Sequence, residues 1–205
     1  MSAVVERTVD VADLPIGTAD SRALLWWGNL GMMVIEGTMF VLLLASYIYF
    51  YTNNLDWPPN TVPNPDLTTS TTALVILVLS FFAMLIADRG AMRGRVGRFR
   101  LGFGICILAG LTFLGIRWAA MSTLGFKWSD HAYGSVVWMM IGLHTFHVIA
   151  ATAEVGLLFV YSFLRPMTKK QFLDARATAV YWYFVILMWL PYYFTIYVAP
   201  YYIRK

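Results

Sequence analysis

The sequence is poor in the residues that soluble, disulfide-bonded or nucleic-acid-binding proteins need. Only 13% of its 205 residues are charged and 60% are hydrophobic, whereas a soluble domain has about 25% charged residues. The single cysteine, Cys106, excludes an internal disulfide framework, and its apolar surroundings favour a buried, inert thiol. The net charge of +4 does not indicate nucleic-acid binding, because the basic residues cluster beside hydrophobic runs. The composition favours a chain dissolved in lipid.

Motifs for catalysis are also missing from the sequence. It contains no phosphate-binding loop, no nucleophile–base pair and no CxxC motif. Residues 1–23 are polar, and they lack both the basic start of a signal peptide and the character of a transit peptide. We expect them to remain in the mature protein as a cytoplasmic segment, followed by one membrane domain over residues 24–205.

Five hydrophobic runs are long enough to cross a bilayer, which takes about 20 apolar residues. They cover residues 24–51, 70–87, 101–120, 134–163 and 179–202. Each is expected to be an α-helix, because a backbone in lipid has to satisfy its own hydrogen bonds. Pro191 lies within the fifth run and should kink it or free a carbonyl near Leu187. The sequence therefore predicts an all-α integral membrane bundle of five transmembrane helices.

The charges of the connections predict the orientation. The second and fourth connections are rich in basic residues, which are Arg89, Arg93, Arg95, Arg98 and Arg100, and Arg165, Lys169, Lys170 and Arg176. The first connection has no Lys or Arg, and the third has only Lys127. The positive-inside rule therefore predicts a cytoplasmic N-terminus and a C-terminus on the outer, periplasmic side of the membrane.

Aromatic residues near the span ends are typical of the belts that anchor helices at the membrane interface. They are Trp26, Trp27, Trp57, Trp128, Tyr201 and Tyr202. The connection that carries Trp57 is rich in proline and is expected to be a stiff segment without regular structure. Arg117, near the outer end of the third run, is expected to extend outward to the interface, a lipid headgroup or a partner.

Most of the functional information lies in the few ionisable residues within the spans. A charge at the bilayer centre costs about 2.5–3.5 kcal/mol on insertion scales, so such a residue needs a partner, a neutral form or a polar site. Glu36 and His147 both fall near the membrane midplane. His144 lies one turn from His147, and Glu154 lies on the same helical face in the cytoplasmic half.

Three interpretations of these residues remain open. In the first, Glu36, His144, His147 and Glu154 form a structural polar network in which the histidines bond Glu36 or a backbone carbonyl and fix the helix packing. In the second, Glu36 is a protonatable carboxyl group that faces lipid or a partner. The third interpretation, a metal or haem site, suffers from a shortage of ligands, because the chain has only three histidines. We therefore expect no cofactor on this chain.

Three motifs are similar to those of subunit III of the haem–copper terminal oxidases, the cytochrome c and quinol oxidases. They are residues 36–40 (EGTMF), 142–148 (GLHTFHV) and 181–185 (YWYFV). The likeness runs from residue 24 onward and matches the five-helix form of the family. In the last motif Trp182 and Tyr183 are candidates for contact with lipid or a partner. Tyr183 and Ile186 stand where the family usually has His and Asp. Arg117 and Ala120 stand where it has Gln or Glu and a further Glu.

The resemblance implies a non-catalytic subunit of a bacterial oxidase in the inner membrane. Such a subunit packs against subunit I, which carries haem and copper, and belongs to a complex with subunit II. It stabilises subunit I, holds phospholipid, and supports proton uptake and oxygen access. The alternatives are an accessory subunit of a nitric-oxide reductase, a small proton-coupled transporter, and a membrane subunit that binds haem itself.

Overall fold

The computed structural model describes residues 24–203, and every regular element in that part of the chain is helical. The five long helices are α1 (Leu24–Asn53), α2 (Leu67–Met92), α3 (Val96–Ser122), α4 (Ala132–Leu164) and α5 (Lys169–Tyr193). A π-helical turn, η1 (Phe194–Val198), and a short helix, α6 (Pro200–Ile203), continue the last of them. Five helical segments are long and apolar enough to cross a membrane, which confirms the predicted architecture. The predicted cytoplasmic segment, residues 1–23, lies outside the described residues.

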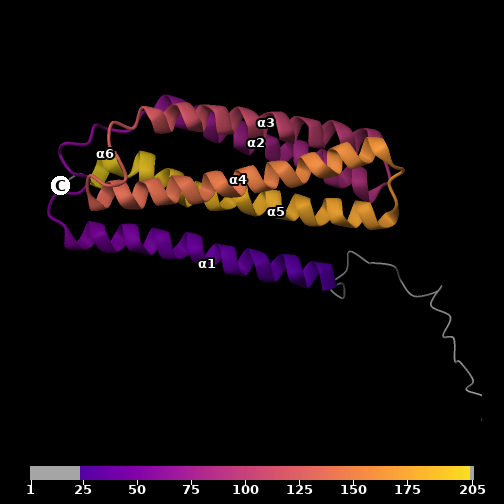
Figure 1. Ribbon diagram of the computed structural model, residues 1–205, viewed down its shortest axis with the longest axis horizontal. Helices are drawn as coiled ribbons and strands as arrows, with labels where there is room; N and C mark the ends of the chain where they lie inside the picture. Colours follow the sequence, from indigo (N-terminus) through magenta and orange to yellow (C-terminus); the bar gives the residue numbers. More distant parts are fainter. Residues whose placement is uncertain (1–23, 204–205) are drawn as a thin grey trace, which may run out of the picture.

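The helices run side by side as an elongated bundle (Figure 1). Helices α2, α3, α4 and α5 pack together, and α1 lies along one side, against α4 and α5. Helix α1 is the least buried of the five spans, so most of its surface faces away from the rest of the chain. Its buried residues are Phe40 and Tyr47, which lie on the side that meets the bundle.

Helices α2 and α3 approach each other closely because glycine faces the contact. A Cβ atom at Gly102 would lie 2.5 Å from the backbone oxygen of Ala83 and 2.7 Å from the backbone nitrogen of Ala87. Small residues allow this approach. Within lipid the hydrophobic effect does not drive helices together, so close packing of this kind is a source of helix association. The tight turn between the two helices contains Gly94, whose φ of +62° is in the left-handed region that glycine adopts readily.

The fifth helix begins at Lys169, earlier than the predicted residue 179. Its first turn is stabilised by a bond from the backbone N–H of Thr168 to Oε1 of Gln171, at 3.0 Å. Polar residues in this first part lower its hydropathy, and for this reason the apolar run in the sequence begins later than the helix. Near the other end, the π-helical turn η1 directly follows the turn that contains Pro191. The irregularity expected from this proline therefore lies three residues beyond it, where the chain has left α-helical geometry.

Candidate functional site

The polar site within the bundle is centred on Glu36 of α1 and His147 of α4. Oε2 of Glu36 lies 3.7 Å from Nε2 of His147, and their side chains are 22% and 6% exposed. Nδ1 of His147 lies 2.7 Å from the backbone oxygen of Leu143, so the Nδ1–H group donates to this carbonyl. The other ring nitrogen, Nε2, therefore faces the carboxyl group with a lone pair if the ring is neutral, or with a second N–H group if the ring is protonated. A lone pair facing a carboxylate is repulsive, so a proton on either group favours the pair. At 3.7 Å the two atoms are within ion-pair range but farther apart than a hydrogen bond, and Oε2 of Glu36 has no hydrogen-bond partner among the described residues.

Tyr181 of α5 extends this pair towards a third helix. It is buried, and its hydroxyl group is close enough to interact with the carboxyl group of Glu36. Glu36 thus contacts side chains from both helices against which α1 packs. Two further bonds attach α1 to α5, from Asn29 Nδ2 to the oxygen of Ala177 (3.0 Å) and from the hydroxyl of Tyr192 to the oxygen of Phe40 (2.9 Å).

His144 does not join Glu36 but bonds to α5. Its Nε2 lies 3.1 Å from the backbone oxygen of Val185, and because a carbonyl can only accept, the ring donates through Nε2. The imidazole is fully buried and packs against the rings of Phe113 and Trp189. This arrangement makes His144 a packing residue between α4 and α5.

Glu154 also has a local partner. The hydroxyl of Thr178 donates to its Oε1 at 2.6 Å, across the α4–α5 contact. Of the four residues predicted to form a network, Glu36 and His147 therefore meet directly, while His144 and Glu154 make separate bonds to α5.

Arg117 lies inside the bundle, contrary to the expectation that it extends outward. Its side chain is 3% exposed, and its Nη1 donates to the hydroxyl of Tyr197 at 2.8 Å. The guanidinium group lies 4.0 Å from the ring centroid of Trp189 and 5.0 Å from that of Phe113. Trp189 of α5, Tyr197 of η1 and Phe113 of α3 itself provide these contacts. The contacts from α5 and η1 could not be inferred from the third hydrophobic run by itself.

The predicted aromatic contact residues differ in their surroundings. Trp57 is 2% exposed and packs against Tyr47, Phe50 and Tyr133, so in this chain it is a core residue and not an interfacial anchor. It belongs to residues 54–66, which form no helix or strand, as predicted.

Trp182 is likewise buried, and its indole N–H donates to Oγ of Ser80 at 3.0 Å, which joins α5 to α2. Tyr183 is half-buried against Phe81. Only Tyr183 of these two thus keeps part of its surface free for lipid or a partner.

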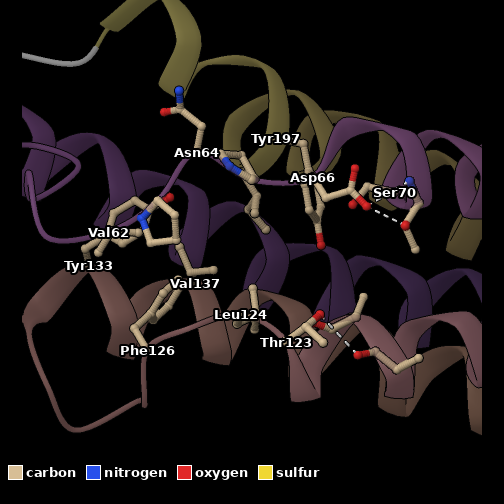
Figure 2. A pocket seen from close by; sticks show the side chains of 16 residues that line it. Val62, Asn64, Asp66, Ser70, Thr123, Leu124, Phe126, Tyr133, Val137 and Tyr197 are labelled. Atoms are coloured by element: carbon tan, nitrogen blue, oxygen red, sulfur yellow. Dashed lines mark hydrogen bonds between the residues drawn. The ribbon is translucent and has the colours of Figure 1, made fainter.

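A cavity of about 490 Å³ opens at the end of the bundle where α2 begins and α3 ends (Figure 2). It was not apparent from the sequence, because its walls combine the first and third connections with residues of α2, α3, α4 and η1. Lining residues include Asp66, Ser70, Ala120, Thr123, Tyr133 and Tyr197. Asp66 caps α2 by accepting bonds from Thr69 and from the backbone N–H of Thr68, and these bonds hold the pKa of its carboxyl group below its usual value.

Within residues 24–203 there is no group of three His, Cys, Asp or Glu side chains placed to bind a metal ion. The fold defines a multi-pass membrane protein with a buried carboxyl–imidazole pair. Comparison of sequences then identifies the family. Residues 29–201 match the family described as cytochrome c oxidase subunit III, and the chain belongs to this family.

Individual relatives agree with this assignment. The chain is 34% identical over 154 residues to the probable cytochrome c oxidase subunit 3 of Nocardia farcinica, covering 70% of this chain and 72% of that protein. It is 32% identical over 149 residues to the protein of the same description from Mycobacterium leprae, covering 69% and 70%. It is 32% identical over 123 residues to cytochrome c oxidase subunit 3 of Triticum aestivum, covering 60% of this chain and 46% of the wheat protein.

Proposed function

We propose that this chain is the non-catalytic subunit III of a bacterial haem–copper terminal oxidase. The match to the subunit III family over residues 29–201 carries this proposal. The same match favours it over the nitric-oxide reductase subunit, the transporter and the haem-binding subunit. The chain would lie in the inner membrane, with its N-terminus in the cytoplasm and its C-terminus outside.

Subunit I, which would hold haem and copper, is the expected main partner, and subunit II the second. The exposed apolar face of α1 supports such contacts, because Ile35, Val41 and Leu42 all point away from the rest of the chain. Phospholipid is the other expected occupant of these apolar faces. An apolar helix face of this kind is equally suited to lipid and to the helix of another subunit.

The pair of Glu36 and His147 is the part of the chain best suited to support proton uptake. A proton on either group removes the repulsion between the carboxylate and the lone pair of Nε2. Glu36 retains partial exposure, while His147 is almost fully buried. A carboxyl group beside an imidazole can hold that proton with no net charge, either as a carboxylic acid facing a neutral ring or as a carboxylate facing a protonated one. The pair would therefore influence proton supply to subunit I and the lifetime of the enzyme in turnover, but not the redox reaction itself.

The test replaces Glu36 with Gln or Ala in the complete oxidase complex. The haem content of the purified complex should stay close to that of the wild type, while inactivation during turnover becomes faster. As a matched control, Thr38→Val changes an exposed side chain of α1 that bonds only to the backbone of its own helix, and should leave the lifetime unchanged. Loss of haem from subunit I in the Glu36 variants would contradict a peripheral role. Proton flux through the chain alone in liposomes would favour the transporter.

A further inference from the structure

The guanidinium group of Arg117 is a buried cation whose hydrogen-bonding capacity is only partly used. Nη1 donates to Tyr197, but Nε and Nη2 have no hydrogen-bond partner in the described part of the chain. No carboxylate within residues 24–203 lies within 4.0 Å of the group. An unpaired charge inside a membrane protein is strongly unfavourable, so a negative group is needed near Arg117.

The surrounding side chains stabilise the cation without neutralising it. Trp189 and Phe113 present ring faces, which attract a cation but carry no net charge. The indole Nε1–H of Trp189 is also buried without a partner. Arginine and tryptophan nitrogens can only donate, and the unpartnered groups of both residues therefore require an acceptor. His144 has one unpartnered nitrogen, Nδ1, which accepts in the neutral ring but supplies no negative charge.

The cavity at the end of the bundle offers a route to this cation. Tyr197, which bonds to Arg117, lines the cavity, as does Ala120, one helical turn after Arg117 on α3. Figure 2 shows the Tyr197 side chain extending into the space between Asp66 and Thr123. The carboxylate of Asp66 also lines this cavity and opposes an entering anion, but its bonds to Thr68 and Thr69 direct its oxygens to the first turn of α2.

We propose that Arg117, with the indole N–H of Trp189, binds a small monovalent anion of the halide class that enters from this cavity. Small size is required because Arg117 is almost fully enclosed and Tyr197 stands between it and the cavity. A single negative charge matches the one unpaired positive charge. The anion would hold α3 and the end of α5 together and would not take part in the redox reaction.

Bromide is the direct probe, because its anomalous scattering distinguishes it from water. Crystals of the complex grown or soaked in bromide should show an anomalous peak within hydrogen-bonding distance of Arg117, and the peak should be absent in Arg117→Gln. Glutamine suits this comparison because it keeps a polar side chain but removes the charge. A wild-type map with no bromide at Arg117, or with water alone there, overturns the proposal.

Stability provides a second measurement that does not depend on crystals. The melting temperature of the complex should rise saturably when chloride replaces gluconate at constant ionic strength, and Arg117→Gln should remove this dependence. Tyr197→Phe keeps the cation and should keep the dependence, because it removes only the partner of Nη1. If Arg117→Gln cannot be purified, the wild type decides the question, since equal melting temperatures in chloride and gluconate contradict anion binding.

Discussion

Replacing Gly102 with alanine tests the close packing of α2 and α3. The new Cβ atom would lie 2.5 Å from the oxygen of Ala83, whereas ordinary contact begins at 3.4 Å, so the helices must separate by about 1 Å. The obstructing atoms at Ala83 and Ala87 include backbone of α2, which cannot move aside as a flexible side chain can. Overpacking of this kind costs about 1–3 kcal/mol. Alanine regains about 1 kcal/mol through its better helix propensity, so the net loss is at most about 2 kcal/mol.

Gly104→Ala on the same helix is the matched control. A Cβ atom there would meet only the ring of Phe159, at 3.6 Å, which is an ordinary contact. The propensity gain is the same at both positions, so the difference between the two variants isolates the overpacking cost of about 1–3 kcal/mol. The assay is unfolding by SDS titration in mixed micelles, followed by circular dichroism. Equal free energies of unfolding for the two variants would refute the reasoning.

Three further predictions concern a buried bond, the pH dependence and the orientation. Trp182→Phe should lower the free energy of unfolding by about 1 kcal/mol through loss of the bond to Ser80, and a double-mutant cycle with Ser80→Ala checks that the loss comes from this bond. Because the pKa of Asp66 is lower in the folded state, its contribution should be present at neutral pH and lost as the pH falls below about 4; Asp66→Asn should lack this step in a pH series of melting temperatures, and an unchanged step would show another origin. A cysteine at Ser129 should react with an impermeant thiol reagent in intact cells, whereas one at Gly97 should react only after permeabilisation, and the reverse pattern would contradict the predicted orientation.

The parts of the fold that could be predicted depend on properties local to the sequence. The five spans follow from apolar length alone, and the equal depth of Glu36 and His147 in the membrane made a contact between them one of the open interpretations. Depth is set by the number of residues from each helix end, and a lone carboxyl group in lipid needs a partner.

Features that depend on how helices face one another could not be predicted. Arg117 was assigned to the interface from its position near a span end, but the aromatic residues of α5 and η1 enclose it. Trp57 was assigned to the interface for the same reason, although its loop folds back onto the rings of Tyr47 and Tyr133. The same limit applies to the cavity lined by Tyr197, whose walls combine segments far apart in the sequence.

Purification of the chain from its native membranes through an affinity tag tests the central claim most directly. The account predicts that larger subunits co-purify, that mass spectrometry identifies an oxidase subunit I among them, and that the haem absorbance follows that subunit. After the partners are removed, the chain itself should have no Soret band. A stoichiometric haem on the isolated chain, or its isolation from mild detergent without any oxidase subunit, would contradict the account.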